Sequence, residues 1–146
     1  MSQVFSTTRR VEFCETDAAG IAHFSAFMCY MEQAEHAFLR SLGLSVVAEL
    51  SDGWHLSWPR VHVECDYHGS ARFEDELLIQ VSVLRLGTKS VTYGFEIRIA
   101  EDELVAVGKV VAVCCRVKSG APLESSTIPE HLRRQLADYL THGEEA

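Results

Sequence analysis

The sequence predicts an α+β fold in which an antiparallel β-sheet curls around one long buried α-helix. Three observations lead to this prediction. One strand-like segment opens the chain, a long apolar helical segment follows it, and four further strand-like segments come after the helix. The helical segment is too apolar to lie exposed on a surface, so the sheet is expected to cover it on most sides.

The helix is predicted from the spacing of its apolar residues. They recur at steps of three and four residues, which places them on one helical face; they are Phe24, Phe27, Met28, Met31, Ala34, Phe38 and Leu42. Gly43 suits the left-handed residue that commonly ends a helix. A polar turn at Asp17, Ala18, Ala19 and Gly20 comes immediately before this segment. The sequence therefore places an acid on a turn that leads into the start of a buried helix.

The strands are predicted from alternation and β-prone composition. A first strand is expected over Val4 to Cys14, and a second over Arg60 to Tyr67. In the second, apolar side chains alternate strictly with polar ones, which indicates a half-buried strand; the apolar set is Val61, Val63, Cys65 and Tyr67. Three more strands are expected over Glu76–Leu86, Ser90–Ile99 and Leu104–Val117. The last is apolar almost throughout, as expected for a central strand or one at a subunit interface.

Two short helices complete the prediction. Residues Leu44 to Leu50 are compatible with a short helix, which the turn Ser51-Asp52-Gly53 would end. Residues Ile128 to Thr141 are expected to form a closing helix with Pro129 in its first turn.

Length and composition indicate one ordinary globular domain that spans residues 1–146. The sequence is 47% hydrophobic and 23% charged, with a formal net charge of −8. This negative charge argues against a general nucleic-acid partner. No apolar run is long enough to cross a membrane, and no signal peptide is recognised at the N-terminus. We therefore expect a cytoplasmic protein.

Metal and disulfide sites are not expected. The five cysteines include no C-x-x-C pair. His62, Glu64 and Asp66 share a strand face and could be proposed as metal ligands, but a solvated polar face is the more common arrangement. We interpret them as surface residues and expect neither a metal nor another cofactor.

Asp17 is the principal candidate for chemistry. The first turn of a helix presents unpaired N–H groups and a partial positive charge, which can hold a carbonyl oxygen as it becomes an oxyanion. An ionised carboxylate within reach of the same carbonyl can attack it or activate a water molecule. The alternative interpretation is that Asp17 only caps its turn, as Asp often does.

The segment around Asp17 resembles a known family. Phe13-Cys14-Glu15-Thr16-Asp17-Ala18-Ala19-Gly20-Ile21, followed by Tyr30-Met31-Glu32-Gln33-Ala34-Glu35, is similar to the hotdog-fold acyl-CoA thioesterases of the 4-hydroxybenzoyl-CoA thioesterase type. The likeness spans roughly residues 4–117. It implies the hotdog fold, in which an antiparallel sheet wraps around the central helix. It also implies that Asp17 is the catalytic carboxylate, and that subunits form dimers or dimers of dimers (homotetramers) with active sites at their interfaces.

The resemblance implies further site residues. The backbone N–H of Phe24 would polarise the thioester carbonyl, and Gly20 would permit a tight turn or a close approach of the substrate. His23 and Phe27 occupy positions where many relatives carry Tyr. His23 could bond to the substrate or to Asp17, or it could simply begin the helix without a chemical role.

The coenzyme A and acyl contacts are less defined by the resemblance. Lys89 and Ser90 lie where the family contacts the phosphates of coenzyme A, although a basic hairpin tip can also be merely solvated. Trp54 and Trp58 could line an acyl pocket or pack in the core. Glu32 and Glu35 lie too far along the helix to serve as the catalytic carboxylate. We interpret them as members of a buried ion pair or a solvated flank.

The predicted function is hydrolysis of an acyl- or aroyl-CoA thioester to a carboxylic acid and free coenzyme A. Asp17 would act as nucleophile or as general base, and the sequence leaves both routes open. Two alternatives are a non-catalytic module that binds acyl thioesters and a thioesterase acting on acyl carrier protein. A hydratase that depends on Asn is excluded because the sequence contains no Asn.

Overall fold

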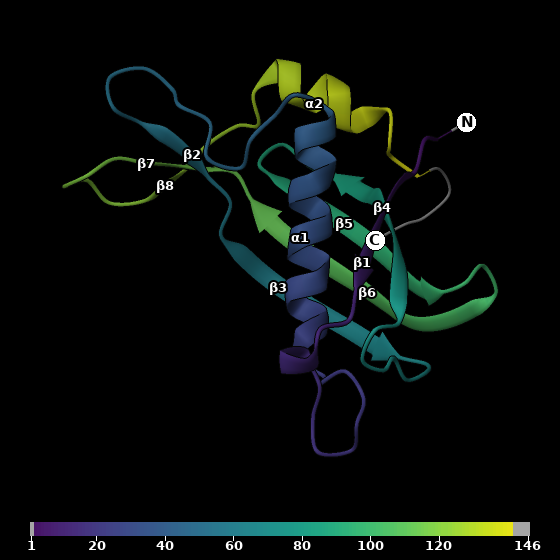
Figure 1. Ribbon diagram of the computed structural model, residues 1–146. Coiled ribbons are helices and arrows are strands. Elements are labelled where there is room, and N and C mark those ends of the chain that lie inside the picture. The colour runs from purple at the N-terminus through teal and green to yellow at the C-terminus, as the bar shows by residue number, and fades with distance from the viewer. Residues whose placement is uncertain (1, 142–146) are drawn as a thin grey trace.

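The computed structural model describes residues 2–141. Its main sheet has five antiparallel strands in the order β1-β4-β5-β6-β3. Their bounds are β1 Phe5–Arg10, β3 Arg60–Tyr67, β4 Glu76–Leu86, β5 Ser90–Ile99 and β6 Glu103–Val113. The single long helix, α1, spans Ala26–Ser41 and lies against one face of this sheet (Figure 1). The predicted α+β fold, a sheet around a long central helix, is confirmed.

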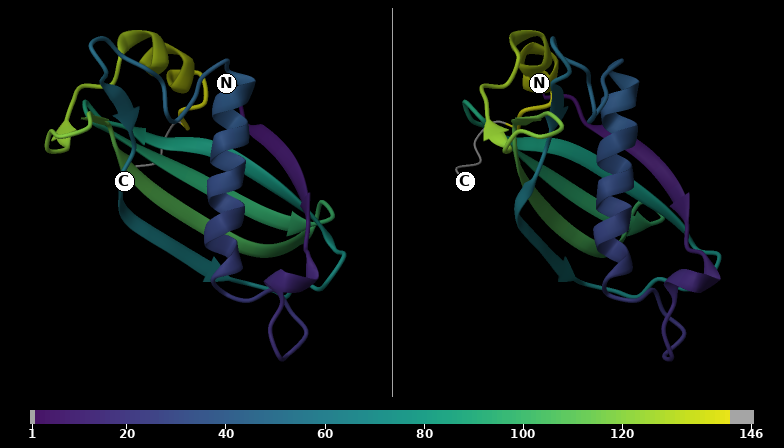
Figure 2. Two further views of the ribbon diagram at one scale, coloured as in Figure 1. Left: turned by 60° about the vertical axis from the view of Figure 1, so that its left-hand side comes forward. Right: turned by 90° about the vertical axis from the view of Figure 1, so that its left-hand side faces the viewer.

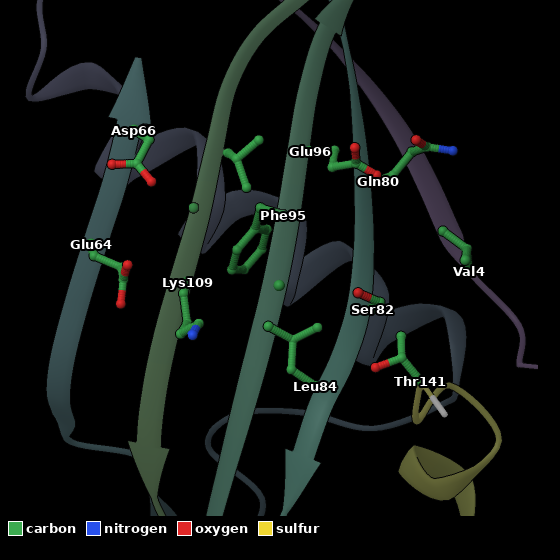
Figure 3. Close-up of a pocket in the computed structure, with 13 residues that line it drawn as sticks. Val4, Glu64, Asp66, Gln80, Ser82, Leu84, Phe95, Glu96, Lys109 and Thr141 are labelled. Carbon is green, nitrogen blue, oxygen red and sulfur yellow. The ribbon is translucent and has the colours of Figure 1, made fainter. Parts of the chain in front are cut away.

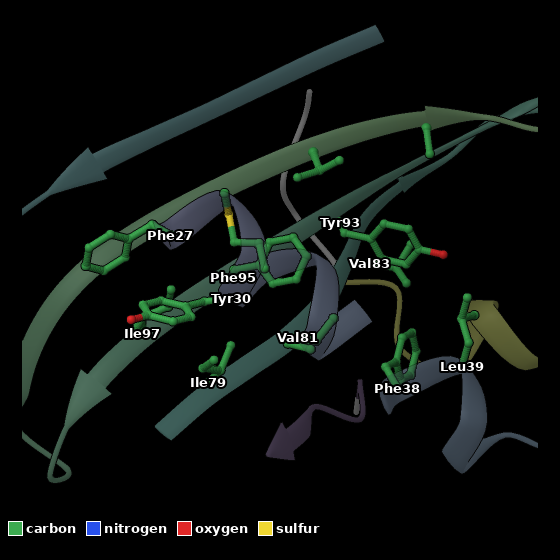
Figure 4. Close-up of a cluster of buried hydrophobic side chains, with 14 of the residues drawn as sticks. Phe27, Tyr30, Phe38, Leu39, Ile79, Val81, Val83, Tyr93, Phe95 and Ile97 are labelled. Carbon is green, nitrogen blue, oxygen red and sulfur yellow. The ribbon is translucent and has the colours of Figure 1, made fainter. Parts of the chain in front are cut away.

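Helix α1 crosses the concave face of the sheet, as both views in Figure 2 show. Its buried residues pack on the inward side chains of the central strands β4, β5 and β6. Phe27, Tyr30 and Phe38 approach the sheet from the helix side, and Ile79 and Tyr93 approach from the strands (Figure 4). Burying such large apolar side chains contributes about 1.5–3 kcal/mol each. This core holds the start of α1 at a fixed place on the sheet.

Gly108 sets how closely α1 approaches β6. A Cβ atom at this position would stand 2.2 Å from Met31 Sδ of α1. The absent side chain therefore leaves the space that the helix occupies. Cys65 pairs with Gly108 across the strands, so the contact lies next to the edge strand β3.

A small second sheet and a short helix complete the structure. The sheet has the order β2-β7-β8, with bounds His55–Ser57, Cys115–Val117 and Glu124–Ser125. It projects from one end of the main sheet (Figure 1). Helix α2 spans Glu130–Ala137 and packs Leu132 and Leu136 into the core. Arg133 Nη2 of α2 donates to Gly87 O at 2.6 Å, which ties the helix to the turn between β4 and β5.

The first and last predicted strands are longer in the sequence than in the structure. β1 ends at Arg10, and Phe13–Glu15 form a short 3-10 helix, η1, in place of the predicted strand end. The run predicted over Leu104–Val117 is interrupted at Cys114, whose N–H donates to Lys89 O. There the chain leaves the main sheet and continues in the small one, so β6 ends at Val113. Apolar composition alone does not mark such a change of sheet.

The predicted short helix over Leu44–Leu50 is absent. Its backbone bonds instead across the following turn, with Leu50 N–H donating to Trp54 O and Leu56 N–H donating to Ala48 O. Helix α2 is also shorter than predicted. Beyond it the chain returns to β4, where Thr141 N–H donates to Val83 O at 2.9 Å.

Strand β3 differs from its prediction in burial. It forms one edge of the sheet, and its predicted half-buried apolar face is largely uncovered within one chain. Val61, Val63 and Tyr67 are 64%, 41% and 45% exposed, whereas Cys65 is partly buried. The prediction was wrong because α1 lies over the central strands and leaves this edge open. An apolar, unpaired edge strand is a surface on which another chain can pair.

The face of the sheet turned away from α1 carries a shallow hollow of about 590 Å³. Figure 3 shows Glu64, Asp66, Glu96 and Lys109 on this face. Carboxylates outnumber the single cation, so the hollow is poorly suited to a polyanionic ligand. None of the helices within residues 2–141 is long and apolar enough to cross a membrane.

Candidate active site

Residues 16–22 form a short hairpin that projects beyond the start of α1 (Figure 1), and Asp17 lies on it. Thr16 pairs with Ala22, and Asp17 N–H donates to Ile21 O at 2.9 Å. The turn closes through Gly20, whose N–H donates to Asp17 O and whose φ of 80° is readily adopted only by glycine. The interpretation of Gly20 as a tight-turn residue therefore matches its geometry.

The Asp17 carboxyl group is half-buried and partly engaged. Its Oδ1 accepts the Ala19 N–H at 2.8 Å. Its Oδ2 makes no hydrogen bond with any residue of the described range, 2–141. One oxygen therefore fixes the side chain on its turn, and the other remains available to a ligand.

Phe24 lies between the hairpin and the first turn of α1. Its N–H makes no hydrogen bond within the part of the chain that the structure describes. Its carbonyl accepts the hydroxyl of Tyr67, at the end of β3, at 2.8 Å. Phe24 is 66% exposed, so it is not the core residue that helical spacing suggested. A free N–H at a helix start is the type of donor that stabilises an oxyanion.

His23 is oriented along the backbone of the helix start. Its Nδ1 contacts Ser25 Oγ at 2.7 Å and accepts the Ser25 N–H at 3.2 Å. Its ring makes no hydrogen bond with Asp17 among the described residues. Phe27, in contrast, is buried and packs edge-on against Tyr67, with ring centroids 5.2 Å apart. Both residues therefore support the helix start in this structure.

Glu15 holds the hairpin in place, a role that the sequence did not reveal. Its Oε1 accepts the Tyr30 hydroxyl at 3.0 Å and the Glu12 N–H at 2.8 Å, and its Oε2 pairs with Arg9. Its carbonyl accepts the His23 N–H at 2.8 Å. One residue thus joins β1, η1, α1 and the returning arm of the hairpin. A carboxylate two residues before Asp17 was a visible signal, but its partners lie far away in sequence.

Lys89 and Ser90 are not brought near Asp17 within one chain. Ser90 begins β5, whereas the hairpin bridges to Arg72, which precedes β4 at the opposite end of the sheet. Ten residues of β5 separate those ends, or about 30 Å at the usual rise of a strand. Lys89 Nζ instead contacts Ser125 Oγ of β8 at 3.3 Å. Any shared site with Asp17 would therefore need a second subunit.

A trough runs between α1 and the edge strand β3. We call it the α1–β3 trough; its lining residues are Met28, Glu32, Glu35, Arg60, Val63 and Val110, and its volume is about 350 Å³. The Tyr67–Phe24 hydrogen bond fixes the strand beside the helix start. Further along, Arg60 Nη2 donates to Glu35 Oε2 at 2.9 Å.

The Glu35–Arg60 pair is the buried ion pair expected for this part of the helix. Glu35 is only 2% exposed. Burial raises the pKa of its carboxyl group to about 7, although the Arg60 guanidinium acts in the opposite direction. Glu32, on the outer flank of α1, is exposed. Glu35 is thus in a buried ion pair and Glu32 is on a solvated flank, as expected. That Glu35 forms a polar end of the trough was not predicted.

The two tryptophans do not line this trough. Trp58 is buried in the core, and Trp54 lies beneath the Arg116 guanidinium, 4.3 Å from its ring centroid. No cluster of three metal-ligating side chains occurs within residues 2–141.

Together the fold and this site define a class of protein: a hotdog-fold protein with a carboxylate and a free N–H beside the start of its central helix. The family model of the thioesterase superfamily matches residues 19–106. The chain therefore belongs to the thioesterase superfamily and is a thioester hydrolase.

Individual relatives agree with this assignment. A 1,4-dihydroxy-2-naphthoyl-CoA hydrolase of Synechococcus elongatus is 26% identical over 126 residues, covering 86% of this chain and 89% of that protein. The structure of a 1,4-dihydroxy-2-naphthoyl-CoA thioesterase from Synechocystis superposes with a TM-score of 0.78 at 26% identity, over 93% of this chain and 96% of the other. A 4-hydroxybenzoyl-CoA thioesterase complex shares the fold with a TM-score of 0.80 at 17% identity, over 92% and 99%.

Proposed function

We propose that this protein hydrolyses an acyl- or aroyl-CoA thioester to the carboxylic acid and coenzyme A. Asp17 serves as the catalytic carboxylate, and the N–H of Phe24 holds the carbonyl oxygen. The observation that carries the proposal is the combination of a free Asp17 oxygen and an unpaired Phe24 N–H on one short segment. The named relatives that act on naphthoyl-CoA support an aroyl thioester as one substrate class.

Two chemical routes fit this arrangement. Asp17 attacks the thioester carbonyl and forms a mixed anhydride that water then hydrolyses, or it removes a proton from a water molecule that attacks directly. In both, negative charge on the carbonyl oxygen is met by the Phe24 N–H and the helix dipole. Thiolate is a good leaving group, so no strong general acid is required.

An assembly of at least two subunits completes the proposal. Apolar side chains lie uncovered around the hairpin and along β3; they are Phe13, Phe24, Val61, Val63, Tyr67 and Phe73. Exposed apolar groups of this extent favour burial against another surface. A dimer joined at β3, or a dimer of dimers, would cover them and would enclose the trough. It would also allow Lys89 and Ser90 of one subunit to contact coenzyme A bound beside Asp17 of another.

The experiment is a colorimetric assay of thiol release from benzoyl-, naphthoyl-, short-acyl- and long-acyl-CoA, with wild type and Asp17→Asn. The substitution preserves shape and removes the charge. We expect wild-type turnover of at least one substrate and a loss of about a hundredfold or more in the variant. Retained turnover in a folded Asp17→Asn protein would exclude Asp17 as the catalytic group. Binding of acyl-CoA without thiol release would favour the non-catalytic binding module.

A second assay determines whether the acyl group is carried by coenzyme A or by acyl carrier protein. The same acyl groups are presented on coenzyme A and on acyl carrier protein, and the two values of kcat/KM are compared. Preference for coenzyme A supports this proposal, whereas preference for the carrier protein would assign the alternative substrate.

A further inference from the structure

The α1–β3 trough ends at a carboxyl group of which one oxygen has no hydrogen-bond partner among the described residues. Its walls are mainly apolar, formed by Met28 from α1, Val63 from β3 and Val110 from β6, and the exposed Glu32 of α1 also lines it. Glu35 lines its far end and is 2% exposed, yet its Oε1 makes no hydrogen bond. An unsatisfied buried acceptor costs about 1–3 kcal/mol. Native structures rarely retain such a group without a use.

The neighbouring Arg60 guanidinium supplies hydrogen-bond donors beside the free Glu35 oxygen, which is an acceptor. Arg60 uses Nη2 for Glu35 Oε2 and Nη1 for the Trp58 carbonyl. Arginine carries five N–H donors, so others remain for a ligand. A hydroxyl group can accept one of these and donate to the free Glu35 oxygen. The terminal torsion of Glu is soft, so a small rotation presents that oxygen to the trough.

We propose that the Glu35–Arg60 pair recognises a hydroxyl group at the distal end of the substrate acyl group. The inference rests on the proposed function, because it takes the trough as the acyl site. The apolar walls accept the carbon skeleton, and the pair accepts only a terminus that both donates and accepts a hydrogen bond. A methyl terminus leaves the buried pair unsatisfied, and therefore binds less tightly.

The helix allows an estimate of the distance from Phe24 to the Glu35 carboxyl group, which the acyl group would have to span. Glu35 is 35 − 24 = 11 residues beyond Phe24, or roughly 16 Å at the helical rise. The side chain leans back toward the helix start by about one turn, which leaves roughly 11 Å. An extended chain of about eight to ten carbons covers this length, whereas the hydroxyl of a hydroxybenzoyl group, about 6 Å from its carbonyl, does not. The preferred hydroxyl is therefore a distant one.

The test uses matched pairs of acyl-CoA thioesters of roughly six to twelve carbons, with and without a terminal hydroxyl. Dissociation constants are measured by calorimetry on Asp17→Asn, which does not depend on turnover. We expect the hydroxylated member to bind about tenfold to a hundredfold more tightly at eight to ten carbons, and the shortest pair to show no difference. Wild-type kcat/KM should show the same preference.

Two variants test whether the preference for the hydroxylated thioester depends on Glu35 and Arg60. In Glu35→Leu combined with Arg60→Met, the ratio of the two dissociation constants should fall to about one, because the pair is replaced by apolar groups of similar size. Glu64→Gln is the matched control, because Glu64 belongs to β3, as Arg60 does, but lies on the face turned away from α1. This variant should leave the ratio at its original value. If the double variant does not fold, Glu35→Met decides the matter, because it removes the acceptor oxygens at similar side-chain length; the ratio should fall by at least about threefold.

The outcomes separate this inference from the proposed function. A ratio near one at every chain length, or a ratio that survives the loss of Glu35 and Arg60, would overturn the hydroxyl site. Absence of thiol release from every acyl-CoA with wild type would overturn the proposed function. In that case the ratio on Asp17→Asn still decides whether the trough selects a hydroxyl group.

Discussion

Two carboxyl groups, one on the hairpin before helix α1 and one within the helix, lie in opposite surroundings. At the start, Asp17 is half-buried on a projecting hairpin and leaves one oxygen unengaged. Further along, Glu35 is enclosed between α1 and β3 and pairs with a single guanidinium. The difference teaches that position decides the task of a carboxylate. We therefore propose different tasks for them: contact with the reacting thioester for Asp17, and selection of the distal end of the acyl group for Glu35.

Removing one member of the buried pair should have the largest effect on stability. Arg60→Met leaves Glu35 enclosed without its cation, so we expect a loss of about 3 kcal/mol at alkaline pH. The loss should be smaller at pH 5, where Glu35 is protonated. Urea denaturation at both pH values measures this difference. The Glu35→Leu, Arg60→Met double variant should recover most of the stability, and equal losses for both variants would contradict the assigned pairing.

The pH dependence of stability should reveal the protonation of Glu35. The pKa of Glu35 is raised from 4.5 to about 7, so the folded protein binds this proton more tightly than the unfolded chain does. This contribution is fully present below about pH 4.5 and is lost as the pH rises to about 7. We expect Glu35 to lower the unfolding free energy by roughly 3 kcal/mol over this interval. Glu35→Gln should abolish that slope, and an unchanged slope would exclude Glu35 as its source.

Loosening the hairpin should affect catalysis more than the fold. Arg9→Gln removes the cation that pairs with Glu15, a contact in which both side chains are partly buried. We expect a fall of about tenfold in kcat and a stability loss of about 1 kcal/mol, because Glu15 then holds the hairpin less firmly. Arg10→Gln is the matched control, since the next residue of the strand is exposed. Equal effects of the two substitutions would contradict this role of Glu15.

The smallest effect is expected from the link between the helix start and β3. Tyr67→Phe removes only the hydroxyl that donates to the Phe24 carbonyl. If that bond positions Phe24, kcat should fall a few-fold while KM changes little, and stability should fall by about 1 kcal/mol or less. Steady-state kinetics on the best substrate gives both values. A change confined to KM would assign Tyr67 to substrate contact instead.

Local patterns in the sequence predicted most of the fold. Alternation and helical spacing located β3, β4, β5 and α1 because these elements bury periodic apolar sets. They missed the end of β1 and the break at Cys114, where hydrogen bonds to distant segments determine the path of the chain. They also missed the exposure of β3. The alternating sequence pattern of a strand is the same at the edge of a sheet as in its interior.

The candidate site was predicted unevenly for the same reason. Asp17, Gly20 and Phe24 form one contiguous segment, so a local motif could identify them, although the catalytic roles stay predictions. Glu15 and Tyr67 act through partners that the fold brings together from β1, α1 and the hairpin. Lys89 and Ser90 lie at the other end of the sheet. No arrangement within one chain could have shown how they relate to Asp17.

The strand order also has a consequence for how the protein is made. Strands β4, β5 and β6 pair with their neighbours in sequence, whereas β1 and β3 are joined to them only at the two edges. Helix α1 is synthesised before any of those three central strands, because synthesis proceeds from the N-terminus. Its apolar face therefore waits for most of the chain to be synthesised before it can be covered. The interval between the synthesis of α1 and of β6 is the period when the nascent chain most needs protection from aggregation.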